Sequence, residues 1–451
     1  MRTLLTRFFV AMFLVGLATI ASAQSRLNQY VDEALENNLV VQQKQIGLDK
    51  AMASLRIAKG MFMPSVSVLG SYTSGEGGRN IAIPVGDLLN PVYTALNQLT
   101  ESNAFPQIEN ANENFFPNNF YDVKVRTSVP ILNSDLIYNQ KLRQQQVVMQ
   151  EFEQIIYKRE LVKEIKVAYF NYLSANEAIA IYRAALDRAA EGKRVNESLL
   201  ANGKGLPAYV LRSQSEIENI AAQLLASEKQ AENAKMYFNF LLNRNQDAVI
   251  ESDSTIQLPA IEKALQQEGQ REELKQLQEA VSINETILQM NKLNWSPKLS
   301  GFLDLGSQYQ NWEFSQQARY YLFGVQLEVP LFAGFTNRNR VRQSKLDVAH
   351  AQLNHHLLSR QIDMGERSAR NNLVVAYQDF NSANAQFASA ASYQRLIDKG
   401  YKEGVNTFIE TIDARTQLTS AQLQVNITRY RALIAHAQLE RAAATYSFTH
   451  Q

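Results

Sequence analysis

The chain of 451 residues contains no cysteine, only 10 prolines and only 19 glycines. The absence of cysteine excludes disulfide bonds, thiolate metal sites and a cysteine nucleophile. The scarcity of proline and glycine leaves long stretches in which nothing interrupts a helix. The 45 basic and 44 acidic residues nearly balance, so the chain lacks the positive excess typical of a nucleic-acid-binding protein. We therefore expect a helix-rich protein that does not bind nucleic acid.

The N-terminus has the layout of a secretory signal peptide. Arg2 and Arg7 precede the apolar run 8–20, which is followed by Ala21-Ser22-Ala23. This run of 13 residues is shorter than the ~20 residues that a membrane-spanning helix needs. We therefore expect a signal peptide, residues 1–23, cleaved after Ala23, in preference to a membrane anchor.

The rest of the chain repeats itself. Val129-Pro130 recurs 200 residues later as Val329-Pro330, and Gly205 recurs 199 residues later as Gly404. Such a constant offset over a long stretch indicates internal duplication. Each half has the order helix, strand, loop, strand, long helix, turn, helix.

We expect one elongated, duplicated body over residues 24–451. The first repeat, 24–243, contains the strands 65–74 and 120–130 and the helices 25–60, 132–200 and 206–242. An equatorial segment follows at 244–270. The second repeat, 271–451, contains the strands 298–309 and 319–330 and the helices 272–294, 336–397 and 405–441. The loop 75–119 is far longer than ordinary loops, which indicates a function or order of its own, with a short helix over 87–99.

The four strands alternate apolar and polar residues over about ten positions, which is typical of outer-membrane β-barrels. Aromatic residues gather at the two ends of the strands: Tyr72, Tyr309, Trp312, Tyr320 and Tyr321 at one, Phe62, Trp295, Phe332 and Phe335 at the other. Only a closed barrel satisfies sheet edges in lipid, and about eight strands are the least that close one. The barrel must therefore be shared between chains. Its polar face, which we expect to line a wet lumen, comprises Asp122, Lys124, Arg126, Ser128, Gln326 and Glu328.

The helices are exceptionally long. At ~1.5 Å per residue, the helix 336–397 extends on the order of 90 Å. The turns 202–207 and 399–404 join each long helix to its returning partner, and we expect them to lie together at a far tip. Just beyond the second turn, Glu410 and Asp413 share one helix face. Acidic residues early in a helix also suit its dipole, which is the alternative reading of this pair.

No catalytic constellation is recognisable. The five histidines do not have the spacing of metal ligands, and Gly75-Glu76-Gly77-Gly78 does not precede a helix as a phosphate-binding loop does. We expect no catalytic residue, no cofactor and no metal.

The segment Gly404-Val405-Asn406-Thr407-Phe408-Ile409-Glu410-Thr411-Ile412-Asp413-Ala414-Arg415 resembles the tip of the second helical hairpin in the TolC family of outer-membrane efflux proteins. With the duplicated strand-Val-Pro-helix pattern, the resemblance covers essentially the whole chain after residue 23. It implies a mixed fold, a membrane β-barrel plus an all-α coiled-coil barrel, with four strands and long antiparallel helices in each chain. A homotrimer completes a 12-stranded barrel in outer-membrane lipid and an α-helical duct across the periplasm.

The resemblance also assigns residues. It places Tyr401, Glu410 and Asp413 at a constricted periplasmic entrance. It makes the hairpin tips, with Gly203, Gly205, Gly400 and Gly404, the docking points of a periplasmic adaptor protein and an inner-membrane pump. Two positions depart from the family pattern, because Asn406 stands in place of an arginine and Leu211 in place of an aspartate.

The leading hypothesis is a passive exit duct of a tripartite efflux system, which has no enzyme activity. Type I protein secretion is an alternative within the same class. A non-conducting, periplasm-spanning structural coiled coil or adhesin is the alternative from another class. The polar strand faces favour a conducting lumen over that last alternative.

Overall fold

The computed structural model describes residues 26–114, 118–252, 256–266 and 269–448, so the predicted signal peptide lies outside the described residues. The chain divides into two compact units. The first comprises Met1–Ala51, Gln145–Ile283 and Val348–Gln451, and the second Met52–Gln144 and Asn284–Asp347. Within the described ranges, no helix combines the length and the apolar character needed to cross a lipid bilayer.

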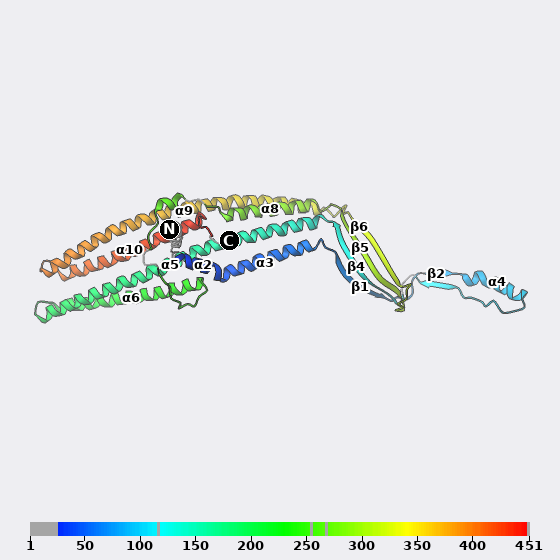
Figure 1. The fold of residues 1–451 in the computed structure, drawn as a ribbon, viewed down its shortest axis with the longest axis horizontal. Helices are drawn as coiled ribbons and strands as arrows, with labels where there is room; N and C mark the ends of the chain where they lie inside the picture. The colour runs from blue at the N-terminus through cyan, green and yellow to red at the C-terminus, as the bar shows by residue number, and fades with distance from the viewer. Residues whose placement is uncertain (1–25, 115–117, 253–255, 267–268, 449–451) are drawn as a thin grey trace, which may run out of the picture. The chain divides into compact units, whose positions relative to one another are not determined.

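The second unit is built on one antiparallel sheet (Figure 1). Its strands are β1 (Ser65–Thr73), β4 (Phe120–Leu132), β5 (Lys298–Gln310) and β6 (Arg319–Glu328), in the order β1-β4-β5-β6. The register between β4 and β5 shifts between Pro130 and Leu132, where the proline has no N–H to donate to the ladder. Among the described residues, β1 pairs only with β4 and β6 only with β5, so both edges of the sheet are open.

A long excursion connects β1 to β4. It contains the short paired strands β2 (Asn80–Ile83) and β3 (Ala111–Asn114), and the helix expected over 87–99 is α4 (Val85–Leu99). The side chain of Asn90 bonds both backbone groups of Ile108, each at 2.9 Å. Asn97 does the same with Phe105, at 2.8 and 3.0 Å. These four bonds fix one face of α4 on the returning chain.

Gly86 permits this close packing. A Cβ atom at this position would lie 2.4 Å from the carbonyl oxygen of Ile108. The positions that face the returning segment, 86, 90 and 97, follow the spacing of one helix face. Contacts within the excursion therefore fix α4 on the returning residues 105–108.

The first helix of the chain differs from the expectation. A single helix over 25–60 was expected, but the structure has α2 (Arg26–Asn37) and α3 (Leu39–Gly60). The side-chain oxygen of Asn38 accepts the N–H groups of Val40 and Val41, at 2.9 and 3.3 Å. Asn38 thus caps the start of α3, a role for which asparagine is among the preferred residues. Its amide also donates to the carbonyl of Leu241, at 2.9 Å, which holds the break against α6 (Pro207–Leu241).

The remaining helices are α5 (Ser134–Ala201), α6 (Pro207–Leu241), α7 (Ile261–Gln266), α8 (Glu272–Lys292), α9 (Thr336–Lys402) and α10 (Phe408–Ala442). In the first unit, α5 and α6 form one hairpin and α9 and α10 another (Figure 1). Their shared core includes the buried rings of Tyr30, Tyr169 and Phe238, with ring centroids 5.2 to 5.9 Å apart.

Side chains of the hairpins bond several backbone carbonyls in the described part of the equatorial segment, 244–270. Arg429 of α10 donates to the carbonyl of Ile256 at 2.7 Å. Tyr377 and Arg370 of α9 donate to those of Pro259 and Leu265. Side chains of the long helices thus satisfy polar groups of a segment with little secondary structure of its own.

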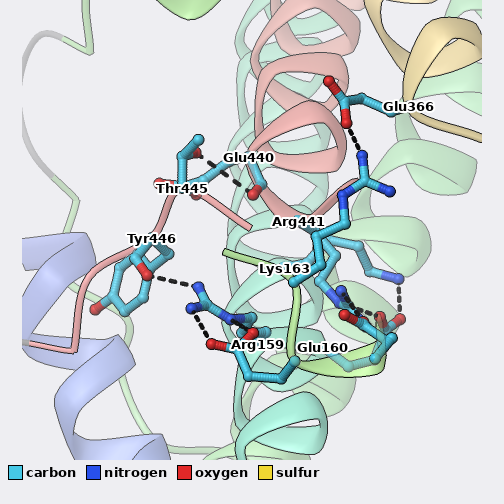
Figure 2. A network of polar contacts seen from close by, with 11 residues as sticks. Arg159, Glu160, Lys163, Glu366, Glu440, Arg441, Thr445 and Tyr446 are labelled. Carbon is cyan, nitrogen blue, oxygen red and sulfur yellow. Dashed lines mark hydrogen bonds and ion pairs between the residues drawn. The ribbon is translucent and has the colours of Figure 1, made fainter. Parts of the chain in front are cut away.

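A buried ion-pair network joins α5 to the start of α8 and to the C-terminal segment (Figure 2). Arg159, 9% exposed, donates two hydrogen bonds to Glu272, at 2.7 and 2.8 Å. Its third donor reaches the carbonyl of Tyr446 at 2.6 Å, and its guanidinium lies 5.2 Å from the ring centroid of Phe448. Arg159 and Glu272 are both buried, so the loss of one of them leaves a buried charge without compensation.

We expect Glu272→Gln to destabilise the helical unit by ~3–5 kcal/mol, the usual cost of breaking a buried pair from one side. Burial opposes the charge of Glu272, but the hydrogen bonds from Arg159 lower its pKa below the ordinary 4.5. This stabilisation is therefore complete above pH 4.5 and is lost as the pH falls through the lower folded value. Thermal unfolding followed by circular dichroism should show a lower unfolding temperature for Glu272→Gln than for the original protein at pH 7. This difference should become smaller in acid.

The control is Glu228→Gln, which breaks an exposed pair with Arg183 at 2.9 Å. Exposed pairs contribute ~0–1 kcal/mol, so the unfolding temperature of this variant should be close to that of the original protein. Equal effects of the two substitutions would contradict the role given to Glu272.

Candidate functional site

The polar face of the sheet carries a network of charged side chains. Arg126 donates two hydrogen bonds to Asp304 on the neighbouring strand, at 2.7 and 2.6 Å. Lys124 pairs with Asp122 at 2.7 Å, and the hydroxyl of Tyr320 donates to the same carboxylate at 2.7 Å. Three strands, β4, β5 and β6, thus contribute charged or hydrogen-bonding side chains to one face.

The other residues predicted for this face occupy the same side. Ser128 lies two residues after Arg126 on β4, while Gln326 and Glu328 alternate along β6 and are exposed. In the register, Gln326 is opposite Ser300 and Glu328 is opposite Lys298. The structure therefore gathers all six predicted polar positions on one face of a single sheet.

Two residues of this network were not identified from the sequence. Asp304, 1% exposed, accepts both hydrogen bonds of Arg126. The sequence did contain a signal for Asp304, because it is a single acidic residue between the apolar Leu303 and Leu305 within a strand. Tyr320 was assigned to an aromatic end cluster, but its hydroxyl bonds Asp122 on the polar face.

The opposite face of the sheet is apolar and exposed. One row across the four strands consists of Val68, Val125, Leu305 and Tyr321, with exposures of 72%, 40%, 53% and 75%. A continuous exposed apolar surface of this kind marks contact with lipid or with another protein.

Aromatic side chains cluster at one end of the strands. The ring of Trp312 stacks on those of Tyr72 and Tyr121, at centroid distances of 5.5 and 5.3 Å. Tyr309 is opposite Tyr121 in the register. At the opposite end, Phe332 and Phe335 contact edge to face at 5.4 Å. Tyrosine and tryptophan favour the interface between lipid and water, because one end of each side chain is apolar and the other polar.

In the helical unit, the first turn joins α5 to α6. Gly203 has a φ of +71°, and the N–H of Lys204 reaches the carbonyl of Leu199 at 2.9 Å. This is the glycine-terminated helix end that suits a left-handed residue. Gly205 serves differently, since a Cβ there would lie 2.6 Å from the backbone nitrogen of Leu200. Pro207 then occupies the first turn of α6, where its missing N–H is not needed.

The second turn joins α9 to α10 in the same manner. Gly404 has a φ of +77°, and the N–H of Val405 reaches the carbonyl of Gly400 at 2.8 Å. Gly400 has a contact of its own, because a Cβ there would overlap the side chain of Asn406 at 1.9 Å. Gly203 is therefore the conformational counterpart of Gly404, where the sequence repeat had indicated Gly205.

Tyr401 connects the two hairpins. Its hydroxyl donates to the side-chain oxygen of Asn196 on α5, at 3.2 Å, and Asn196 in turn donates to Ser213 of α6 at 2.9 Å. Asn196 and Ser213 are 2% and 1% exposed. Burial raises the pKa of the Tyr401 phenol, so it stays a neutral donor at physiological pH. Phe408, on α10, packs against both Tyr401 and Tyr209, at centroid distances of 6.2 and 5.2 Å.

Glu410 closes a capping box at the start of α10. Its carboxylate accepts the backbone N–H of Thr407 at 2.6 Å, while its own N–H donates to the Thr407 hydroxyl at 3.4 Å. The N–H of Thr407, together with the side chains of Asn406 and Thr407, lowers the pKa of Glu410. Asp413 lies on the next turn of the helix and is exposed. In one chain, Glu410 thus has a local role and is ionised at neutral pH.

The two departures from the family pattern have defined surroundings. Asn406 donates to Glu410 at 3.2 Å, so it supports the cap in place of a charged contact. Leu211 is 72% exposed on α6. Positive charge is instead supplied by Arg415, whose guanidinium lies 4.0 Å from Asp398 and donates to the carbonyl of Arg188 at 3.4 Å. Gly192 makes room for it, because a Cβ there would lie 2.2 Å from Arg415.

A cavity of about 820 Å³ lies between the two hairpin ends. Tyr401, Arg415, Asp398, Lys204 and Phe408 are among the residues that line it. Sequence reasoning missed Arg415 and Asn196 as members of this region, because each acts through a residue more than 200 positions away. Within the described ranges, no group of three or more His, Cys, Asp or Glu side chains is placed to hold a metal ion.

A family model described as outer membrane efflux protein matches residues 30–244 and 269–445. Outer membrane protein TolC of Escherichia coli is 23% identical over 317 residues, 63% of this chain and 61% of that protein. Alkaline protease secretion protein AprF of Pseudomonas aeruginosa is 22% identical over 305 residues, 62% of this chain and 60% of that protein. The matched part thus spans about three fifths of the length of these relatives.

Solved structures share the fold over nearly the whole chain. The outer-membrane channel OprN has a TM-score of 0.75 at 17% identity, with 93% of this chain and 90% of that chain covered. The outer membrane protein VceC of Vibrio cholerae has a TM-score of 0.75 at 14% identity, with 93% and 96% covered. At such identities the likeness establishes the fold alone, which combines a four-stranded sheet and long helical hairpins.

Proposed function

The chain belongs to the outer membrane efflux protein family, and from this premise we propose that it is the trimeric exit duct of a tripartite efflux system. It conducts substrates passively from an inner-membrane pump and a periplasmic adaptor across the periplasm and the outer membrane. The energy comes from its partners, and the chain itself performs no catalytic step.

The observation that carries the proposal is the open four-stranded sheet with one charged and one apolar face. Unpaired strand edges in lipid are costly, so the sheet must close with copies of itself. Two copies would give eight strands. The interior of a barrel of that size is filled by its own side chains. Three copies give twelve, which leaves space for the bulky polar face that carries Arg126, Tyr320 and Phe302. Three copies therefore fit a barrel with a wet lumen.

The two helical hairpins of each chain supply the duct. Three chains contribute six hairpins, which pack side by side as a helical barrel. Their apolar contacts are of the kind that join α5 and α6 to α10, and α9 to α10, within one chain. Each α5 begins two residues after β4 ends, so barrel and duct are continuous along the chain. The glycine turns form the periplasmic tips, at which the adaptor and pump dock, and Tyr401, Glu410 and Asp413 surround the entrance.

The location follows from this assignment. The apolar face of the sheet contacts outer-membrane lipid and the helical unit lies in the periplasm. Delivery there requires removal of the signal peptide after Ala23. The near balance of charge agrees with a body exposed to water along its length.

Type I protein secretion is the second candidate. One relative bears the name alkaline protease secretion protein, which is the observation that favours this candidate. The two systems differ in the pump, so loss of the gene separates them. Increased sensitivity to small toxic compounds supports efflux, whereas a missing protein in the culture medium supports secretion.

The duct is tested by purifying the protein from membranes in detergent and inserting it into planar lipid bilayers. Native mass spectrometry should give three chains, and the same preparation should conduct ions in discrete steps. A monomer that retains its full β-sheet signal in circular dichroism would refute the shared barrel. A trimer without conductance would favour the structural coiled coil or adhesin.

A further inference from the structure

The helix α4, in the excursion between β1 and β4, has an apolar stripe that its own chain leaves exposed. Leu88, Val92 and Leu99 are 69%, 51% and 81% exposed. Together with Val85 and Ala95, they repeat at alternating intervals of three and four residues over two heptads. Leu89 and Leu96 flank this line. Apolar residues at a 3.5-residue period are the seam along which parallel helices pack on one another.

The other side of α4 is already occupied. Gly86, Asn90 and Asn97 face the returning segment and are fixed there by close packing and hydrogen bonds. The helix therefore presents its stripe in a fixed orientation, away from the segment that holds it.

The charge of the excursion indicates whether the stripe contacts a membrane surface or other copies of α4. Residues 75–119 contain five acidic residues and one basic residue, a net formal charge of −4, and Asp87 is the sole charged residue of α4. A helix that lies on a membrane surface typically carries Lys and Arg on its polar face, and this one carries neither. Three nearly uncharged helices, in contrast, can approach one another with little repulsion.

We propose that the α4 helices of three chains pack on one another along this stripe and form a three-helix bundle at the outer mouth of the barrel. The inference rests on the trimer of the proposed function. The excursion leaves β1 at Thr73 and re-enters β4 at Phe120, the strand ends that are not joined to helices α3 and α5. A shared barrel therefore brings the three excursions to the same end.

The bundle depends on this tethering. A 15-residue helix with two heptads is too short to associate stably by itself in water. Tethered copies instead meet at an effective concentration in the millimolar range, which favours packing of a short seam. The packed bundle covers the outer mouth, so the duct has a constriction at the end opposite the helical tips.

Single cysteines test the arrangement cleanly, because the natural chain has none. Val92→Cys places a thiol on the stripe. Thr94→Cys is the matched control, since Thr94 is exposed, similar in size and about 200° further round the helix. After mild oxidation of purified trimers, we expect on the order of ten-fold more disulfide-linked dimer from Val92→Cys than from Thr94→Cys.

The same samples are examined by native mass spectrometry, which separates this inference from the one on which it rests. Equal cross-linking at both positions, or none at Val92, in intact trimers would overturn the bundle and leave the duct standing. A preparation without trimers would overturn both. Quenching of a fluorophore on Cys-substituted Val92 by brominated lipid would assign the stripe to the membrane instead.

Discussion

Val325→Lys is expected to prevent the protein from accumulating as trimers in the outer membrane. Val325 lies within β6 on the apolar face and is 63% exposed in the single chain. A lysine on the lipid side near the middle of a membrane barrel costs ~2–4 kcal/mol, and each of the three chains contributes that cost. Val125→Lys, on β4, should act in the same way.

The neighbouring position supplies a matched control. Gln326 is also exposed on β6 but points to the charged face, so Gln326→Lys adds the same side chain to a wet lumen. Ser128→Lys is the corresponding control on β4. Trimer yield from purified outer membranes, measured by native mass spectrometry, should fall sharply for the two valine variants alone. Similar yields from all four would show that the assignment of faces to lipid and lumen is wrong.

The faces of the strands could be predicted from the sequence because a strand alternates sides at every residue. Asp122, Lys124 and Arg126 share a face whatever the strand pairs with. The partner of Arg126 could not be predicted in this way, since Asp304 is 178 residues distant and its position depends on the register between β4 and β5. A shift of one residue would have moved it to the other face.

For the helices, too, features that depend on contacts with distant residues could not be predicted from the sequence. Their length follows from local propensity and the lack of proline, but the break at Asn38 depends on a contact with Leu241 of another helix. At the tips, glycine indicates a turn, yet the left-handed residue of the first turn proved to be Gly203. The bond from Tyr401 to Asn196 joins two hairpins, so no local pattern announces it. In contrast, the capping box of Thr407 and Glu410 is readable from the T-x-x-E spacing.

That capping box bears on the last prediction, which concerns the charge of the periplasmic entrance. In a trimer, three copies each of Glu410 and Asp413 would place six carboxylates around one opening. Within each chain, the bonds from Thr407 and Asn406 lower the pKa of Glu410, whereas crowding of like charges acts in the opposite direction. The capped geometry therefore helps the ring to stay ionised at neutral pH.

A ring of ionised carboxylates selects cations and concentrates them at a narrow opening. We therefore expect a cation-selective pore that a trivalent cation blocks when it is added at the side of the helical tips. The variant Glu410→Gln with Asp413→Asn should lose both the selectivity and the block. Glutamine at this position still completes a capping box, so the start of α10 should remain intact and trimers should form at normal yield.

The block is measured by single-channel current, with the trivalent cation added to one side of the bilayer at a time. The control is Glu403→Gln, which removes an exposed acid from the same turn, 3.9 Å from Lys399, without touching the cap. It should retain the block, because its charge is already offset by its neighbour. If the double variant is blocked as strongly as the original protein, Glu410 acts only as a helix cap and Asp413 only as an exposed residue of α10. In that case the blocking cation must bind elsewhere along the duct, with the Asp398 and Arg415 region between the hairpins as the next position to examine.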